Sequence, residues 1–291
     1  MNEQTAAAPP NAEQIDYWNG PVGLRWLAYN DWLDERTAAY GRAAFAAAAP
    51  QPGESVLDIG CGAGATSFEL ARAVGASGSV TGVDVSAPLL GRARERAAAQ
   101  GMNVEFREAD ASRPGFAAHS FDLLYSRFGV MFFDDPTAAF AELHKTLKPG
   151  GRLAFACWQG PQLNDWYELP LAAIADLVER TPVDTRQPGP FALSDADRVR
   201  EVLGEAGFAQ IELEPFATPF YLGRGATREA MADDAMAQVF RVGPIARLLE
   251  SHSEQTNAKA REAIRAALLR IAGDDGLEVG GAVWVVTARK E

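Results

Sequence analysis

The chain has 291 residues, of which 47% are hydrophobic and 23% are charged, a composition typical of a globular protein that excludes disorder over most of its length. Its formal net charge of −12 disfavours a nucleic-acid partner, because binding to phosphates depends mainly on clustered Lys and Arg. No stretch approaches the roughly 20 apolar residues of a membrane-spanning helix. We therefore expect a cytoplasmic protein without a membrane span and without a nucleic-acid partner.

The first 50 residues divide into a tail and a helical segment. Residues 1–14 have neither the cationic residue nor the apolar core of a signal peptide, and we expect them to form a flexible tail. Residues 15–50 should form N-terminal helices, since Trp26, Tyr29 and Leu33 recur at helical spacing. Residues 51–291 would then form the main domain.

Between residues 55 and 158, short apolar runs alternate with helical patterns. One helix is predicted to follow Ser86 and to end before Gly101. Another should begin after Asp135, with Pro136 in its first turn. This alternation predicts βα units around a parallel sheet. The predicted strands are 55–59, 79–85, 104–108, 121–126 and 152–158.

Two long segments interrupt the rest of the chain. Strands are predicted at 210–216 and 282–288. The segments 159–193 and 223–281 fit no βα unit, and we expect them to be cap insertions near the functional site, since loops on a rigid α/β scaffold commonly carry specificity. The second segment is predicted to be helical at 230–241 and 262–271.

A glycine-rich turn follows the first predicted strand, in VLDIGCGAGATSFELA. Gly60, Gly62 and Gly64 permit positive φ and leave the backbone open to a ligand. The same stretch satisfies the dinucleotide pattern G-x-G-x-x-G/A, so glycine spacing alone leaves NAD and S-adenosylmethionine open. Asp58, two residues before the first glycine, would repel a pyrophosphate and could reach a ligand amino group, directly or through water.

Acidic residues end the next two predicted strands. Asp84 is placed where its carboxylate could accept both hydroxyls of a ribose, and Val85 adjoins it. Asp110 could accept the exocyclic amine of an adenine, while Ala111 offers a backbone N–H to the ring. Together with the glycine turn, these residues predict a site for an adenine nucleoside.

The chain has two cysteines, Cys61 and Cys157, far apart in the sequence. Neither belongs to a CxxC pair or lies near a histidine-rich segment, so the sequence indicates no disulfide framework and no metal site. We expect both to be packed thiols.

Five motifs stand in a characteristic order: VLDIGCGAG, TGVDVS, EADA, FDLLYSRFGVMFF and LKPGGRLAF. Over residues 55–158 the chain resembles a class I S-adenosylmethionine-dependent methyltransferase, and is most similar to the quinone and other small-molecule branch. The resemblance implies an α/β doubly wound, Rossmann-like sheet of seven strands with the last antiparallel. It also implies S-adenosylmethionine at the carboxyl ends of the first strands.

The resemblance assigns roles to particular residues. Gly60, Gly62 and Gly64 would face the methionine part, Asp84 the ribose and Asp110 the adenine. Ser126 and Phe128 would lie near the sulfonium. Two interpretations of the N-terminal helices stay open: they cover an edge of the sheet, or Tyr17, Trp18 and Arg25 help to close the cofactor site.

One departure narrows the acceptor. SRFGVMFF stands where nucleic-acid N-methyltransferases carry Asn/Asp-Pro-Pro-Tyr/Phe, so a small-molecule acceptor is expected. The cap insertions should build its pocket, and their apolar residues suit a flat or lipophilic compound. His252 is the histidine to test as a general base. The residues expected in this pocket are Trp166, Tyr167, Phe191, Met231, Met236, Phe240 and His252.

Two other functions remain in competition with methyl transfer. One is a module that binds S-adenosylmethionine or its product without chemistry, and the other is a nicotinamide-dependent oxidoreductase. The sequence does not identify the acceptor atom, and it leaves the oligomeric state open, a homo-oligomer included.

Overall fold

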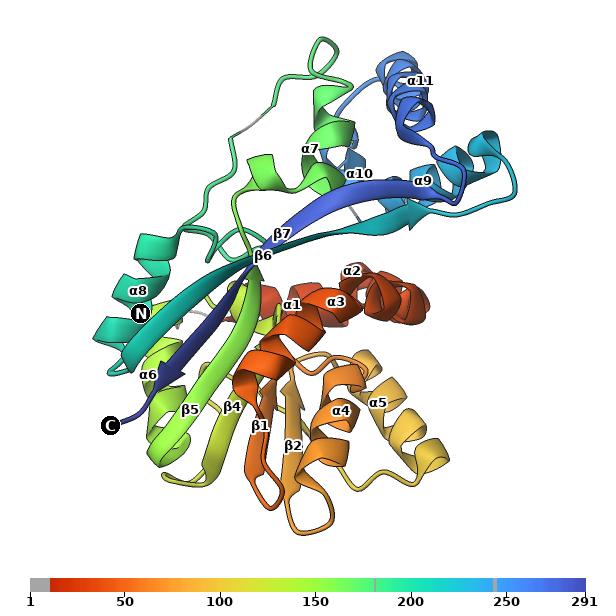
Figure 1. Ribbon diagram of the computed structural model, residues 1–291. Helices are drawn as coiled ribbons and strands as arrows, with labels where there is room; N and C mark the ends of the chain where they lie inside the picture. Colours follow the sequence, from red (N-terminus) through yellow and green to blue (C-terminus); the bar gives the residue numbers. More distant parts are fainter. Residues whose placement is uncertain (1–10, 181, 243–244) are drawn as a thin grey trace, which may run out of the picture.

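The computed structural model describes residues 11–180, 182–242 and 245–291, and its centre is a seven-stranded sheet (Figure 1). The strand order is β3-β2-β1-β4-β5-β7-β6. Strands β1 to β5 pair in parallel, whereas β7 is antiparallel to both of its neighbours, β5 and β6. The predicted doubly wound sheet with an antiparallel last strand is therefore confirmed. The strands are β1 (Ser55–Ile59), β2 (Ser79–Asp84), β3 (Glu105–Glu108), β4 (Phe121–Arg127), β5 (Leu147–Trp158), β6 (Ala209–Gly223) and β7 (Leu277–Arg289).

Crossover helices pack on both halves of the sheet. The helices α4 (Ala65–Val74) and α5 (Ala87–Gln100) contact β1, β2 and β3, while α6 (Pro136–Thr146) and α8 (Ala196–Glu205) contact β5 and β6. Helix α6 begins as its sequence predicts, because the Asp135 side chain accepts a hydrogen bond from the Ala138 N–H at 2.9 Å. Short connections between strand and helix keep the carboxyl ends of the parallel strands at one edge.

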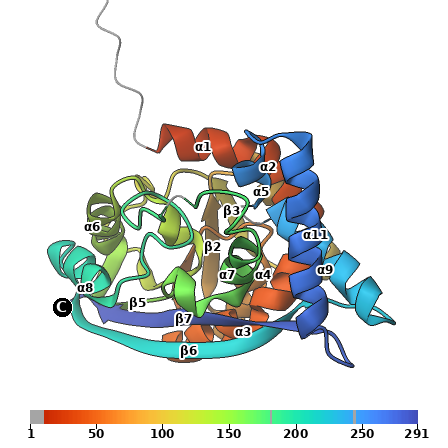
Figure 2. The ribbon, with the colours of Figure 1, turned by 90° about the horizontal axis from the view of Figure 1, so that it is seen from above.

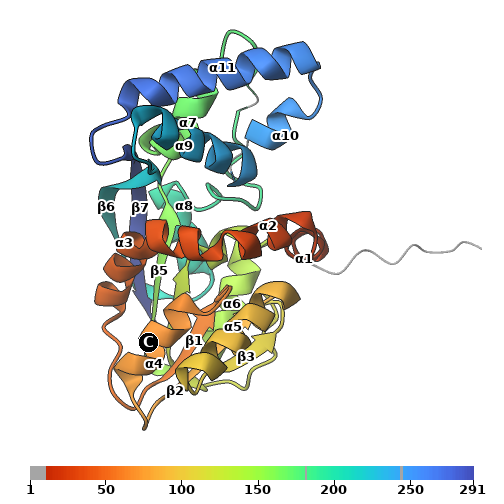
Figure 3. The same cartoon turned by 90° about the vertical axis from the view of Figure 1, so that its right-hand side faces the viewer.

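Three N-terminal helices lie between the carboxyl ends of the parallel strands and the helices α7 (Asp165–Ala172), α9 (Arg228–Val242) and α11 (Glu254–Ile271) that follow later in the chain (Figure 3). The N-terminal helices are α1 (Ala12–Asn19), α2 (Pro21–Ala28) and α3 (Asn30–Ala48). Helix α1 begins within the segment expected to be a tail, and residues 1–10 of that segment lie outside the described residues. Helix α3 contacts β4, β5, β6 and β7.

A second hydrophobic cluster lies beyond the sheet. We call this part the cap: it comprises α7, α9, α10 (Ile245–Leu249) and α11, with the ends of β6 and β7 that leave the sheet. Helices α9 and α11 lie side by side, away from α6 and α8 (Figure 2). The two insertions predicted from sequence thus share one apolar core. Its buried members include Leu171, Ile174, Met231, Ala235, Ile264 and Leu268.

Strands β6 and β7 are longer than predicted, at 209–223 and 277–289. Pro219 pairs with Gly280, and Thr218 with Gly281. Proline and glycine usually interrupt strands, so the sequence alone does not predict that pairing continues here. The proline is tolerated because β6 is the edge strand of the sheet. Gly281 is required because a Cβ there would lie 2.1 Å from the hydroxyl of Tyr40 on α3.

We predict that Gly281→Ala lowers the free energy of unfolding by about 1–3 kcal/mol, because the added methyl group forces Tyr40 away from its hydrogen bond to the Thr218 carbonyl. Urea unfolding followed by circular dichroism measures the change. Gly91→Ala is the control: nothing lies within 4 Å of its added Cβ, and the helix should gain about 0.5–1 kcal/mol. Equal stability of Gly281→Ala and the unmodified protein would contradict the prediction.

Candidate active site

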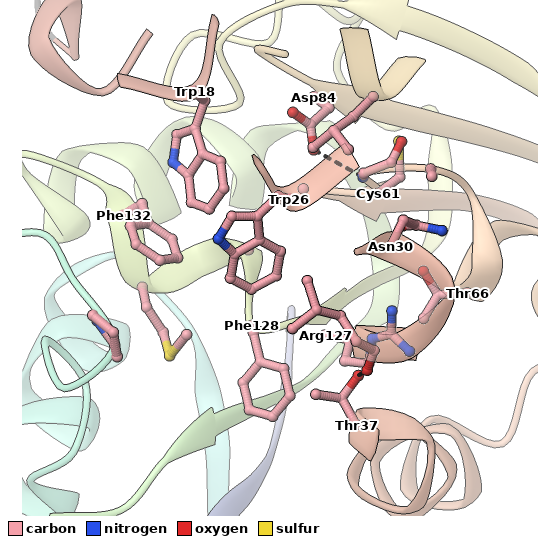
Figure 4. A pocket seen from close by; sticks show the side chains of 18 of the residues that line it. Trp18, Trp26, Asn30, Thr37, Cys61, Thr66, Asp84, Arg127, Phe128 and Phe132 are labelled. Atoms are coloured by element: carbon pink, nitrogen blue, oxygen red, sulfur yellow. Dashed lines mark hydrogen bonds between the residues drawn. The ribbon is translucent and has the colours of Figure 1, made fainter. Parts of the chain in front are cut away.

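A cavity of about 280 Å³ lies between the carboxyl edge of the sheet and the cap. It opens beside β1 and β4, where the strand order reverses and where doubly wound sheets bind ligands. Figure 4 shows Trp18, Trp26, Phe128 and Phe132 on one side of it, and Asp84, Thr66 and Arg127 on the other. Its size is that of a small-molecule site.

The glycine turn forms the floor of this cavity at the end of β1. Gly60 has a φ of 65°, and a Cβ there would lie 2.6 Å from the Cα of Gly129. Gly62 has a φ of 52° with no atom within 4 Å of the Cβ position, so its backbone is open to a ligand. Gly64 begins α4 and packs against Phe106 instead, outside the cavity lining.

Asp84, at the end of β2, lines the cavity beside the turn. One carboxylate oxygen accepts the Gly62 N–H at 2.8 Å (Figure 4), and the other accepts the Ser86 N–H at 2.8 Å. Burial raises the pKa of Asp84, and these backbone hydrogen bonds oppose that effect. Each oxygen keeps a further lone pair, so the group can accept the two hydroxyls of a ribose.

Asp58 is fully buried beneath the turn and does not line the cavity. Its Oδ2 accepts hydrogen bonds from the hydroxyls of Thr66 at 2.7 Å and Ser67 at 2.6 Å. These bonds join β1 to the first turn of α4, so the carboxylate holds the glycine turn in place. Its expected direct contact with a ligand amino group is therefore not seen, although Oδ1 has no partner among the described residues and could accept from a water.

Val85, Asp110 and Ala111, three of the residues predicted to bind the cofactor, all line the cavity. The carboxylate of Asp110 accepts from the Asn11 side-chain amide at 2.9 Å and from the Ser112 hydroxyl at 2.6 Å. Asn11 also lines the cavity and is nearly buried, at 4% exposure. Sequence reasoning missed Asn11, because nothing local relates it to a residue so distant in the chain.

The end of β4 contributes two residues in different ways. Ser126 is buried outside the cavity, where its hydroxyl donates to the Ile59 carbonyl at 2.7 Å and accepts from the Gly129 N–H. Phe128 lines the cavity with a φ of 68°, unusual for a bulky residue, and stacks on Trp158 with ring centroids 4.5 Å apart. Ser126 therefore supports the turn, while Phe128 forms a wall.

Of the three residues on the N-terminal helices that were expected to close the cofactor site, the structure places one at the cavity. Trp18 lines the cavity and packs edge-on against Trp26 and Phe132. Tyr17 and Arg25 are not part of the lining. The Trp18 carbonyl accepts a hydrogen bond from the Ser86 hydroxyl just after β2, which holds Trp18 at the cavity.

Of the residues expected in the acceptor pocket, Trp166 alone is in the cavity lining. Tyr167 and Phe191 pack against Trp166, and Met231 is buried in the cap core.

His252, the candidate general base, lies between α10 and α11, where its Nδ1 contacts the Leu248 carbonyl at 3.1 Å, so the structure does not place it on the cavity. Met236 and Phe240 pack against the cap core, and neither lines the cavity. The cap contributes Phe220, Leu222, Gln238 and Val239 instead, and Pro190 lines the cavity from the loop between α7 and α8.

A charged network on the cavity wall was also missed. Arg127, directly after the predicted fourth strand, donates to the Asp34 carboxylate at 2.6 Å. Asp34 also pairs with Arg96 at 3.2 Å, and Arg96 donates to the Ala63 carbonyl of the glycine turn. The motif SRF signals Arg127, but its partner on α3 has no local signal.

Both cysteines are buried free thiols, as expected, although Cys61 also borders the cavity. Within the described ranges, no group of three or more His, Cys, Asp or Glu is arranged to hold a metal ion. The helices of the described residues include none that is long and apolar enough to cross a membrane.

Comparisons with known proteins agree with this geometry. Residues 56–151 match the family described as Methyltransferase domain. Aklanonic acid methyltransferase from Streptomyces sp. (strain C5) is 43% identical over 107 residues, 36% of this chain and 49% of that protein. Nocamycin O-methyltransferase from Saccharothrix syringae is 33% identical over 172 residues, 56% of this chain and 61% of that protein. The chain thus spans about half the length of these curated relatives.

A solved structure shares the fold at low sequence identity. The crystal structure of a putative methyltransferase from Bacillus halodurans C-125 aligns with a TM-score of 0.56 at 19% identity, covering 86% of this chain and 98% of that one. Fold, sequence matches and cavity agree over part of the chain: residues 56–151 match the methyltransferase domain, whose methyl donor is S-adenosylmethionine. The open glycine turn and Asp84 offer such a donor space and hydrogen-bond acceptors, and aromatic side chains form the walls of the cavity.

We predict that Asp84→Asn weakens binding of S-adenosylhomocysteine by about 1.5–3 kcal/mol, since it removes hydrogen bonds to a charged group. Isothermal titration calorimetry measures the loss. Asp195→Asn is the matched control: Asp195 caps α8 outside the cavity lining, and asparagine caps a helix equally well. Unchanged affinity in a folded Asp84→Asn protein would remove Asp84 from the site.

A second prediction concerns the pH dependence of stability. Burial raises the pKa of Asp58 to about 6 from 3.8, with hydrogen bonds from Ser67 and Thr66 opposing. The folded state therefore binds this proton more tightly than the unfolded state. As pH rises from about 4 to about 6, the free energy of unfolding of the unmodified protein should fall by about 2–3 kcal/mol relative to Asp58→Asn. Urea titrations of both proteins across this range measure the difference, and a constant difference would contradict it.

Proposed function

We propose that the chain transfers the methyl group of S-adenosylmethionine to a small-molecule acceptor by in-line displacement inside this cavity. The observation that carries the proposal is the continuity of the cavity from the glycine turn to the cap. Asp84 and Gly62 lie at one end, and Leu222 and Val239 lie at the cap end. One cavity can therefore hold donor and acceptor together, as direct transfer requires.

The lining suits a reaction in which charge disappears. S-adenosylmethionine supplies a methyl group on a positively charged sulfur, which becomes neutral on transfer. Aromatic faces attract such a cation, and they keep water away from the reacting atoms. The aromatic residues that line the cavity are Trp18, Trp26, Trp32, Phe128, Phe132, Phe133, Trp158, Trp166 and Phe220.

The described titratable groups of the cavity lining offer no obvious general base, so we infer that the acceptor is already deprotonated when it binds. No histidine, lysine or tyrosine belongs to the lining as the described residues define it. Asp34 is engaged by two arginines, and burial raises the pKa of the Cys61 thiol. Asp84 and Asp110 also line the cavity, and both already accept hydrogen bonds. The chain's main contribution is therefore alignment and exclusion of water.

A small acceptor is supported from two directions. The relatives named for aklanonic acid and for nocamycin act, by those names, on small molecules. The net charge of −12 disfavours nucleic acid. The apolar cap residues Phe220, Leu222 and Val239 suit a flat or lipophilic body. A homo-oligomer remains compatible with this activity.

The test is incubation of the protein with cell extract and S-adenosylmethionine carrying a deuterated methyl group, followed by mass spectrometry. We expect a product of low mass that carries the deuterated methyl group and that disappears with the Asp84→Asn protein. Cofactor binding without any labelled product would favour a binding module instead. Calorimetric binding of NAD in place of S-adenosylhomocysteine would favour an oxidoreductase.

A further inference from the structure

Polar groups without partners gather at the cap end of the cavity. Arg36 and Trp32 lie on α3, and Gln238 lies on α9 opposite them. All three line the cavity; Arg36 is 8% exposed and Gln238 is 6% exposed. Buried polar groups in folded proteins nearly always have hydrogen-bond partners, so a cluster of exceptions indicates a missing ligand.

Among the described residues, the ion-pair partner of the Arg36 guanidinium is the carboxylate of its exposed neighbour Glu35. The Nε of Arg36 has no partner among the described residues, and its Nη1 reaches the Trp32 carbonyl at 3.4 Å and Glu35 at 3.6 Å. Glu35 is itself exposed, and such a long surface pair contributes little. Burial lowers the pKa of Arg36, against the opposing effects of Glu35 and Asp234.

Arg127, the other arginine of the lining, makes the contrast clear. Its nitrogen lies 2.6 Å from the Asp34 carboxylate, so its charge is compensated within the protein. Arg36 is more buried, yet its carboxylate contact is the longer one to exposed Glu35, and a buried charge that is only weakly compensated costs free energy. The cap end of the cavity therefore favours a ligand group with a negative charge.

Trp32 and Gln238 surround the same space. The Arg36 guanidinium lies 3.9 Å from the centroid of the Trp32 ring, and the indole N–H of Trp32 has no partner among the described residues. The side-chain oxygen of Gln238 has none either. The amide can turn either its N–H₂ or its oxygen toward a ligand, because the two orientations have nearly the same shape.

We propose that Arg36 and the indole N–H of Trp32 bind a carboxylate of the methyl acceptor, so that the substrates are flat, apolar carboxylic acids. The inference rests on the proposed function, since it identifies the acceptor end of the same cavity. Phe220, Leu222 and Val239 contact the apolar body, and Gln238 contacts the polar end. Arg36 acts here as a specificity residue through a charge-assisted hydrogen bond.

The test uses 2-naphthoate and its uncharged analogue 2-naphthamide as probes on protein saturated with S-adenosylhomocysteine. Calorimetry should show naphthoate binding at least about tenfold more tightly than naphthamide, the factor expected for one hydrogen bond to a charged group. Arg36→Gln should remove this preference and leave the affinity for S-adenosylhomocysteine unchanged. Arg224→Gln is the matched control, because Arg224 contacts Glu35 at 3.6 Å outside the cavity lining.

Equal affinity for the two probes, no measurable naphthoate binding, or equal effects of Arg36→Gln and Arg224→Gln would each overturn the proposal. If Arg36→Gln does not fold, Trp32→Phe decides: it keeps an aromatic ring, removes the N–H and should weaken naphthoate severalfold more than naphthamide. Probe binding is measured without turnover. A preserved naphthoate preference with no labelled product would therefore contradict the methyl transfer and not the carboxylate site.

Discussion

The ion pair between Asp34 and Arg127 joins helix α3 to the end of β4 at 2.6 Å, and the cavity depends on it. Helix α3 supplies lining residues both near the glycine turn and under the cap, Asn30 and Arg36 among them. Arg96 extends the pair to the Ala63 carbonyl, so polar contacts connect α3, β4 and the glycine turn. Further along α3, the Tyr40 hydroxyl donates to the Thr218 carbonyl of β6, so the helix that lines both ends of the cavity is held to the sheet at two places.

Two buried carboxylates at the edge of the sheet have different tasks. Asp58 is directed inward, where two hydroxyls bind it, and it shapes the turn without reaching the cavity. Asp84 is held by two backbone N–H groups and faces the cavity. The residues share a chemical type and a position near a strand end, but their neighbours give one a structural role and leave the other available to a ligand.

The position of the cap is set by β6 and β7, whose pairing continues past the end of β5. Pro219 and Gly280 face each other in this extension, and Tyr40 of α3 fills the space beside Gly281. The extension places Phe220 and Leu222 at the cavity, together with Gln238 and Val239 of α9. The cap end of the cavity is therefore built by the extended end of β6 and by α9, apart from the glycine turn at its other end.

The sequence by itself determined the sheet, the glycine turn and most of the nucleoside end of the site. These features are local: apolar runs specify buried strands, glycine permits the φ of 52° at Gly62, and an acid at the end of a strand lies at the carboxyl edge. Tertiary structure alone decided that Asn11 reaches Asp110, that Arg36 and Gln238 line the same cavity and that His252 is not in its lining. Each depends on which faces of separate helices meet, and helical periodicity identifies an apolar face without identifying its partner. The same limit explains Asp58, because burial on both faces of a central parallel strand hides from the sequence which side its carboxylate will take.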